Sequence, residues 1–558
     1  MSHHRRLIAT AAMLAAGVVA VPSTAAAAAP SPVGAAARPV AAGASALPKA
    51  LSAGFRTFTS PASDSERGQG VPVGATSSQG VAATPDPTLR VGLTGTTDSA
   101  YGLNLVTSVT GAAGVPLTVT VAWGDGSTST ATLTGSGNVT SDHTYPQVGA
   151  FKATVTVTDG RGDTVTNSLS GVTAGSDLTP FGPTRLLDTG TGLGAPKAKV
   201  GPDSVLRLRI GGNHGIPTGV TAAVLNVTVA DPTSSGHLSA YADGTALPAT
   251  SNINFVAGQT VPNQVVVTVG ADGYVDLYNA SGGTVNLITD IAGYFSTTAA
   301  SGYTPITPHR LLDTRKGIRV AQAQVPGHSS ITALIAGAHK GVLPATGVTA
   351  VALNITASGA KGAGFLSVVP DGVTSITTSN VNFGANQTIA NAAIAPVGAD
   401  GRIRVYNGSA LPTDIVVDVV GYYSAASRGA YVPLPPTRLL DTAAPAVSAL
   451  PGGDYLHLAL NVAWANVTSW VLNTTVTDTA TGGSLAVGWD PNTQEMYLFG
   501  SAGRPATPLY SSLNWTRGET VANLVQARPG PYGLVDFWNT GTGSTDLLVD
   551  AFGMYENR

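Results

Sequence analysis

Short stretches in which apolar and polar residues alternate run through most of the chain and predict β-strands. In residues 151–158 the first, third, fifth and seventh side chains are apolar and the others are Lys or Thr, so the two faces of a strand differ. Residues 205–210 alternate in the same way, whereas residues 414–420 are apolar on both faces, as in a central strand. Glycine and proline interrupt these stretches, and no segment has a convincing amphipathic helical period. The pattern predicts an all-β protein.

One long pattern occurs three times in the second part of the chain. It opens with Arg-Leu-Leu-Asp-Thr at residues 185–189, 310–314 and 438–442. Equivalent asparagines lie 128 residues apart from Asn254 to Asn382 (382 − 254), which is close to the length of a single domain and too long for a solenoid repeat. We therefore expect three tandem modules, each an independent β-sandwich or jelly-roll-like unit, with the choice between these two folds left open.

The segments before the modules differ in composition. A basic start, an apolar stretch and a run of alanines are typical of a secretory signal peptide. The segment after it is rich in Ala, Pro, Gly and Ser and has too few apolar side chains to offset the conformational entropy lost on folding. The expected organisation is a signal peptide (1–29), a flexible linker (30–87), an immunoglobulin-like sandwich (88–176) and repeat modules 1 (177–297), 2 (301–425) and 3 (429–558).

The segment 88–176 carries a motif set that favours a small sandwich. Trp123 is large enough to fill its core, Asp125-Gly126 is a strong hairpin signal, and Tyr145 can pack while its hydroxyl reaches the backbone. Together with the strand at 149–159, these motifs resemble the PKD family of immunoglobulin-like domains. The resemblance implies a spacer or binding module of a secreted or surface protein.

The three modules also resemble a recurring module of secreted actinobacterial proteins. The resemblance rests on the Arg-Leu-Leu-Asp-Thr opening and on the closing sequence Asp-hydrophobic-hydrophobic-Gly-Tyr at residues 290–294 and 418–422. In the third copy the closing tyrosine is replaced by Met554. The resemblance implies secretion, and it implies no particular activity.

Composition excludes several classes of function. Charged residues make up 11% of the chain and the net charge is −3, so the sequence lacks the basic field that nucleic acid or an anionic membrane requires. There is no cysteine, and hence no disulfide or thiolate metal site. Histidines are not paired at ligand spacing and no stretch has the Asp-x-Asp-x-Asp-Gly pattern of a calcium loop, although Asp-Gly turns are abundant. We expect no transition-metal site, no cofactor and no membrane span in the mature chain, and the Asp-Gly turns leave calcium binding open.

Each module repeats an arginine near its start and an aspartate in its apolar closing strand. Because an unpaired buried carboxylate is costly, each arginine is expected to pair with the closing-strand aspartate of its own module rather than to bind a ligand carboxylate. The predicted pairs are Arg185 with Asp290, Arg310 with Asp418, and Arg438 with Asp550.

Repeated asparagines and clustered tryptophans allow a carbohydrate interpretation. Asparagine amides can bind sugar hydroxyls, but asparagine at strand ends more often satisfies local backbone, and we expect that structural role. Five of the six tryptophans lie in module 3. Trp515 and Trp538 replace aromatic residues of the other copies, whereas Trp464, Trp470 and Trp489 are additions, which either pack in the core or form a sugar-stacking platform. The candidate ligand-binding residues are Trp464, Trp470, Trp489, Asp490 and Asn492.

These observations favour a secreted, non-catalytic protein, extracellular or loosely attached to the cell surface, whose modules bind cell-envelope or extracellular polysaccharide with repeated weak sites. The alternative is a structural spacer or display protein with protein partners at the cell surface. A third possibility is a glycoside hydrolase with its site in module 3, since paired carboxylates could supply the acid and the base. Surface aromatic residues in module 3 would favour binding, and their burial would favour the spacer.

Overall fold

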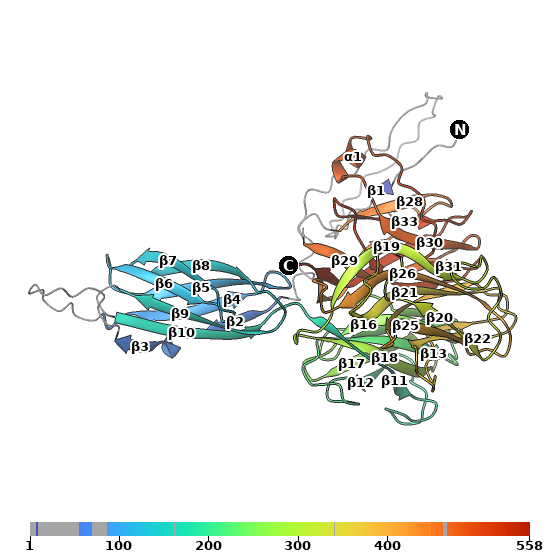
Figure 1. Cartoon of the computed structure of the whole chain (residues 1–558), viewed down its shortest axis with the longest axis horizontal. Coiled ribbons are helices and arrows are strands. Elements are labelled where there is room, and N and C mark those ends of the chain that lie inside the picture. Colours follow the sequence, from blue (N-terminus) through green and yellow to red (C-terminus); the bar gives the residue numbers. More distant parts are fainter. Residues whose placement is uncertain are drawn as a thin grey trace, which may run out of the picture.

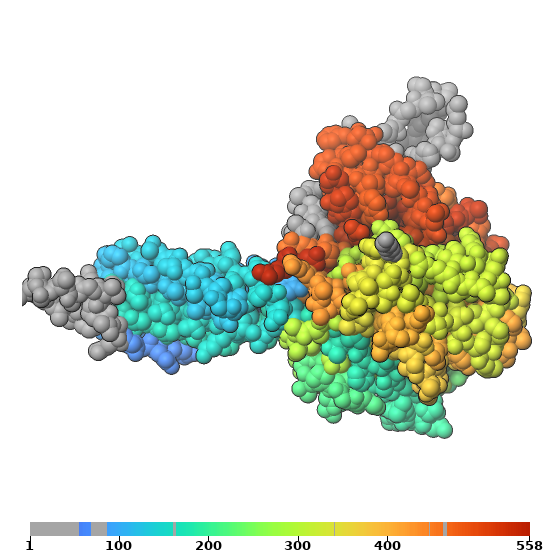
Figure 2. All heavy atoms as spheres, viewed as in Figure 1, coloured from blue at the N-terminus to red at the C-terminus, as the bar shows by residue number. Residues whose placement is uncertain are grey.

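The computed structural model describes residues 7–8, 55–69, 86–159, 163–339, 341–445, 447–460 and 466–558. Almost all regular structure in these residues is antiparallel β-sheet, in agreement with the all-β prediction (Figure 1). The predicted signal peptide lies outside the described residues except for the two-residue strand β1 (Leu7–Ile8). Figure 2 shows one elongated domain that projects from a larger body, and the larger body holds the three modules.

The projecting domain is a two-sheet sandwich, as predicted for residues 88–176. Its sheets have the strand orders β3-β10-β9-β6-β7 and β2-β4-β5-β8. The strands are β2 (Thr57–Ser60), β3 (Glu66–Gln69), β4 (Arg90–Thr96), β5 (Gly102–Thr110), β6 (Pro116–Ala122), β7 (Thr128–Thr134), β8 (Gly137–Thr144), β9 (Ala150–Thr158) and β10 (Asp163–Val172).

The prediction of a flexible linker was wrong for residues 57–69. β2 pairs with β4, a 3-10 turn η2 follows at Ala62–Asp64, and β3 pairs with β10. Phe58 packs against the sandwich core, with its ring edge on Phe151 at a centroid distance of 5.7 Å. The sandwich therefore begins about thirty residues before the predicted boundary, because Phe58 packs on the core and the backbones of β2 and β3 are paired with the two sheets.

Each repeat module is a jelly roll. In all three copies the first, eighth, third and sixth strands form one sheet and the second, seventh, fourth and fifth form the other, which is the eight-stranded jelly-roll order. The strand order therefore decides between the two folds that the sequence left open.

The strands of modules 1 and 2 fall within the predicted ranges 177–297 and 301–425. Module 1 comprises β11 (Asp177–Asp188), β12 (Ser204–Arg209), β13 (Ala222–Ala230), β14 (Gly236–Ala242), β15 (Ile253–Phe255), β16 (Val261–Thr268), β17 (Tyr274–Ser281) and β18 (Asn286–Ser296). Module 2 comprises β19 (Gly302–Asp313), β20 (Ser329–Leu334), β21 (Val348–Ser358), β22 (Gly364–Pro370), β23 (Val381–Phe383), β24 (Ile389–Pro396), β25 (Arg402–Asn407) and β26 (Asp414–Ser424).

Module 3 follows the same plan and adds a short helix. It comprises β27 (Ala430–Asp441), β28 (Tyr455–Ala459), β29 (Val467–Thr477), β30 (Gly483–Trp489), α1 (Gln494–Leu498), β31 (Leu513–Trp515), β32 (Val521–Ala527), β33 (Leu534–Asn539) and β34 (Asp546–Glu556). β1 pairs in parallel with β28 at the edge of its outer sheet.

The modules are not independent units, so that part of the prediction was wrong. Each has its own core between its two sheets, but a fourth buried cluster combines side chains from the inner sheets of all three. Within this shared cluster the hydroxyls of Tyr423 and Tyr555 are hydrogen-bonded at 2.6 Å, and the Gln526 amide donates to both. An inner sheet that buries both faces cannot leave its neighbours without exposing apolar surface to water.

The sandwich is held against module 3 rather than tethered to module 1 alone. The backbone N–H of Ala100 donates to the Glu556 carboxylate at 2.5 Å, and the Tyr101 hydroxyl donates to the Arg428 carbonyl at 2.6 Å. Ser176, at the entry to module 1, forms a bridge with Tyr431 of module 3. The start and the end of the three-module body therefore meet at the sandwich.

Candidate functional site

The three predicted arginine–aspartate pairs are present in the structure. Arg185 Nε lies 2.9 Å from Asp290 and Arg310 Nε lies 2.6 Å from Asp418, and Arg438 is bonded to Asp550 in the same way. The aspartates are nearly inaccessible, and burial raises the pKa of the Asp290, Asp418 and Asp550 carboxyls even though the arginines act in the opposite direction. These groups link the first strand of each module to its last, which is a structural role.

The predicted core and turn residues of the sandwich also have structural partners. Trp123 is buried and its indole N–H donates to Ser129 at 2.8 Å, while the Tyr145 hydroxyl donates to the Trp123 carbonyl. Asp125 accepts bonds from Ser127, and Gly126 has a φ of +93°, which completes the turn. Burial opposes ionisation of Asp125, but hydrogen bonds from Ser127 and His143 lower its pKa to about 2.

Two sets of the repeated asparagines join the modules to one another. The Asn263 amide donates to Asn473 at 3.0 Å, the Asn523 amide to Asn354 at 3.1 Å, and the Asn391 amide to Asn226 at 3.4 Å. We call these six side chains the asparagine ring, because the bonds run from module 1 to 3, from 3 to 2 and from 2 back to 1. A third set, Asn279, Asn407 and Asn539, satisfies carbonyls of its own module, as the sequence predicts.

The tryptophans of module 3 divide between core and surface. Trp470 is 1% exposed and fills the core where the other copies have Ala223 and Val351. Trp464 lies outside the described residues. Trp489 is 44% exposed at the end of β30. Of the three additions, only Trp489 is placed by the structure where it can meet a ligand.

Asp490 and Asn492 belong to a buried network. Asp490 accepts bonds from the Asn492 amide at 2.8 Å and from the Tyr497 hydroxyl at 2.5 Å, and both residues are almost fully buried. Nearby Asp536 is also buried; burial, and then the neighbouring Asp490, raises its pKa to about 9. The network fixes the loop that carries α1, so Asp490 and Asn492 support the surface rather than form it.

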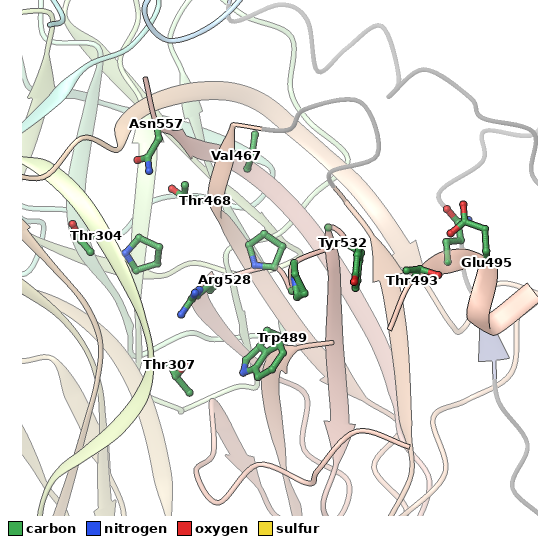
Figure 3. Close-up of a pocket in the computed structure, with 16 residues that line it drawn as sticks. Thr304, Thr307, Val467, Thr468, Trp489, Thr493, Glu495, Arg528, Tyr532 and Asn557 are labelled. Carbon is green, nitrogen blue, oxygen red and sulfur yellow. The ribbon is translucent and has the colours of Figure 1, made fainter. Parts of the chain in front are cut away.

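Trp489 lines a cleft of about 990 Å³ between modules 2 and 3 (Figure 3). β19 of module 2 contributes Thr304, Pro305 and Thr307 to one side. Module 3 contributes Trp489, Arg528 and Tyr532, which is 55% exposed, together with Pro529 and Pro531. The remaining lining residues are Val467, Thr468, Thr493, Gln494, Glu495, Gly530, Gly533 and Asn557.

The cleft residues of module 3 differ from those at the same strand positions in the other copies. The last residue of β14, β22 and β30 is Ala242, Pro370 and Trp489. The turn before β17, β25 and β33 reads Gly-Ala-Asp-Gly twice and Gly-Pro-Tyr-Gly in module 3, so Tyr532 replaces Asp272 and Asp400. Arg528 likewise replaces Thr268 and Pro396. Separate departures from the shared scaffold thus converge on one surface.

An enlarged loop completes the far end of the cleft. The connection after β14 spans residues 243–252 and that after β22 spans 371–380, whereas the connection after β30 spans 490–512 and contains α1. Thr493 caps α1 through its hydroxyl, which accepts the Met496 N–H at 3.1 Å, and Glu495 lies in the first turn. The extra residues therefore add Thr493, Gln494 and Glu495 to the wall of this cleft.

Sequence reasoning found Trp489 but missed Tyr532 and Arg528. Aligning the glycine turns of the three copies would have shown both replacements. The lining residues of module 2 carry no such signal, because Thr304, Pro305 and Thr307 reach this cleft only through packing of one module on another.

The arrangement suits binding of a hydroxyl-rich ligand. Exposed indole and phenol rings offer flat apolar faces, and the threonine hydroxyls and the Asn557 amide around them can donate and accept. Glu495 is the single carboxylate in the described lining. Among the described residues no group of three or more His, Asp or Glu side chains is arranged to hold a metal ion.

Comparison with known proteins adds little to this picture. The sequence matches no protein-family model and no curated protein. A chain from the triple jelly roll and turret assembly of an archaeal virus is 10% identical, with 70% of this chain and 86% of that chain covered and a TM-score of 0.14. A chain from Sulfolobus Turreted Icosahedral Virus is 11% identical, with coverage of 70% and 87% and a TM-score of 0.15. The jelly-roll assignment rests on strand order, not on these similarities.

No helix in the described part of the chain has both the length and the apolar character needed to cross a membrane.

Proposed function

We propose that the protein is a secreted, non-catalytic binding protein that holds a polysaccharide of the cell envelope or the extracellular medium in the cleft between modules 2 and 3. The observation that carries the proposal is the exposure of Trp489 beside Tyr532 in a cleft where the other two copies have no aromatic residue at either position. Sugar rings bury their C–H faces on such rings while their hydroxyls bond to polar neighbours.

The amino-terminal sequence and the two family resemblances support secretion. A signal-like segment opens the chain, the sandwich resembles PKD domains, and the modules resemble repeats of secreted actinobacterial proteins. On this proposal the sandwich acts as a rigid spacer, since it is bonded to the carboxyl-terminal strand through Glu556.

The sequence predicted a weak binding site in each module, whereas this proposal gives modules 1 and 2 a structural role. They lack the aromatic residues of the cleft, and their inner sheets complete the shared core. Binding is thus assigned to one site in the body rather than to avidity among three.

A spacer without a glycan ligand is the second candidate, and the burial of Trp470, Asp490 and Asn492 favours it. The hydrolase alternative has less support. Paired-carboxylate hydrolysis requires two acids flanking the bond, whereas Glu495 is the only acid in the described lining, and Asp490 and Asp536 are buried beneath the surface.

The test is retention of the mature chain from residue 30 onward by insoluble glycans, including peptidoglycan, chitin and cellulose. The whole chain is needed because module 2 supplies one side of the cleft. Trp489→Ala is expected to abolish retention, and Phe499→Ala is the matched control, because Phe499 is 82% exposed on the same enlarged loop but does not line the cleft. If Trp489→Ala and the parent chain are retained equally, the cleft is not the binding site.

A further inference from the structure

We infer that the end of the cleft formed by Trp489 and Arg528 binds an acidic sugar, specifically a uronic acid residue within a polysaccharide. This inference rests on the proposed function and adds to it the class of ligand. It rests on the guanidinium of Arg528 and on the cleft residues around it.

Arg528 follows β32 directly and is exposed in the cleft. The described part of the chain places no carboxylate within 4.0 Å of its guanidinium, whereas Arg185, Arg310 and Arg438 are each paired. Threonine and proline occupy its position in modules 1 and 2, so the jelly roll does not require an arginine there. A cation that the fold neither needs nor neutralises is available to a ligand.

The charges of the cleft are separated along its length. Figure 3 shows Arg528 close to Trp489, with Glu495 on the far side of Tyr532 beside Thr493. Glu495 also has a local role, because a carboxylate in the first turn of α1 stabilises that helix terminus. The Trp489 end is therefore positive, and an anionic group would be favoured there.

Geometry favours a carboxylate attached to a sugar ring. The carboxylate of a uronic acid projects from the edge of the ring, so a ring stacked on the Trp489 indole can direct it past the edge of the indole toward the neighbouring guanidinium. Arginine binds carboxylates with two parallel hydrogen bonds. Thr304, Thr307 and Thr468 line the same cleft and can bond the remaining hydroxyls.

The experiment compares two forms of one polymer. Polygalacturonate and the same polymer after reduction of its carboxyl groups to alcohols are titrated against the mature chain, against Arg528→Gln and against Trp489→Ala. The parent chain is expected to bind polygalacturonate at least about tenfold more tightly than the reduced polymer, which corresponds to loss of a hydrogen bond to a charged group. Arg528→Gln is expected to remove that preference, so that the variant binds polygalacturonate and the reduced polymer equally.

The outcomes separate this inference from the proposed function. If Trp489→Ala abolishes binding but Arg528→Gln keeps the full preference for polygalacturonate, the cleft binds glycan and the uronate inference is overturned. Equal binding of both polymers by the parent chain overturns it as well. If the parent chain binds neither polymer nor any neutral glycan, both proposals fail. Tighter binding of poly(glycerol phosphate) than of polygalacturonate would assign Arg528 to a phosphate and overturn the uronate. Matching thermal unfolding of the variants excludes misfolding as the cause.

Discussion

The side-chain amide of Asn523 donates a hydrogen bond to the side-chain oxygen of Asn354, 3.1 Å away, although the two residues are 169 positions apart and belong to different modules. The same Asn523 amide donates to the Ser512 carbonyl, and its oxygen accepts the backbone N–H of Ala392 in module 2. Both donors and the oxygen of this buried side chain are thus hydrogen-bonded, and two of the three bonds cross to module 2.

Replacement of this asparagine is expected to destabilise the whole three-module body. Asn523→Leu leaves the Ser512 carbonyl and the Ala392 N–H without partners in a buried setting, which costs about 1–3 kcal/mol for each group. Because the modules share a core, chemical unfolding of the variant should remain one transition shifted to lower denaturant. A second, separate transition for module 3 would show that the modules unfold independently.

The arginine–aspartate pairs between the first and last strands of each module should contribute more to the free energy of unfolding than exposed ion pairs do. Arg310→Gln leaves the Asp418 carboxylate, whose side chain is 3% exposed, without its cation, and we expect a loss of about 3 kcal/mol in the free energy of unfolding. Arg402→Gln is the matched control, since Arg402 and Asp400 form an exposed pair at 3.8 Å, for which less than about 1 kcal/mol is expected. Equal losses in the two variants would contradict the structural role of Arg310.

Stability should fall between mildly acid and neutral pH because of Glu556. Burial raises the pKa of this carboxyl from 4.5 to about 7, despite a hydrogen bond from Ala100. The folded state therefore binds the proton more tightly than the unfolded state, so the stabilisation is complete below pH 4.5 and is lost as the pH rises to about 7. The expected change is about 3 kcal/mol.

The variant Glu556→Gln should remove this part of the pH dependence. Urea unfolding of the parent chain and of the variant at several pH values between 4.5 and 8 measures the difference. If the free energy of unfolding depends on pH equally in both proteins, the pKa of Glu556 is not raised by its burial between the sandwich and module 3.

The other modules provide a design for a variant that loses the site but keeps the fold. Trp489→Ala, Arg528→Thr and Tyr532→Asp together install the residues that module 1 carries at these positions, namely Ala242, Thr268 and Asp272. Since module 1 folds with them, we expect the unfolding midpoint to change little while glycan affinity falls roughly 30-fold or more, as for loss of a binding hot spot. Isothermal titration and thermal unfolding test the two halves of this prediction.

The sequence predicted those features that lie within one copy of the repeat. Arg310 and Asp418 could be paired because burial of a charge demands a partner and both positions recur in every copy; Asp313, three residues after Arg310, is a second partner at 2.7 Å. The asparagine ring could not be predicted, because Asn263 meets Asn473 only when modules pack on one another, and spacing within a copy does not encode that contact. β2 and β3 were missed because an average over residues 30–87 hides a short strand around Phe58.

The candidate site was predictable in part. Trp489 was recognised as an addition, but Trp470 was not separable from it, because a tryptophan in a strand can face either the core or solvent. The enlarged loop was visible in the sequence: Asn473 and Asn514 are 41 residues apart (514 − 473), against 28 for Asn226 and Asn254 (254 − 226). The contribution of β19 depends on the arrangement of the modules and needed the structure.

Covalent linkage of the three jelly rolls has a consequence for how such a protein can change. In an assembly of three identical chains every substitution appears three times, so an exposed tryptophan at the end of β30 would create three clefts and would alter every contact between subunits. In one chain, module 3 can carry Trp489, Arg528 and Tyr532 while modules 1 and 2 carry other residues at these positions and maintain the shape. The three similar jelly rolls form the shared core, and the residues that differ in module 3 form one cleft at Trp489.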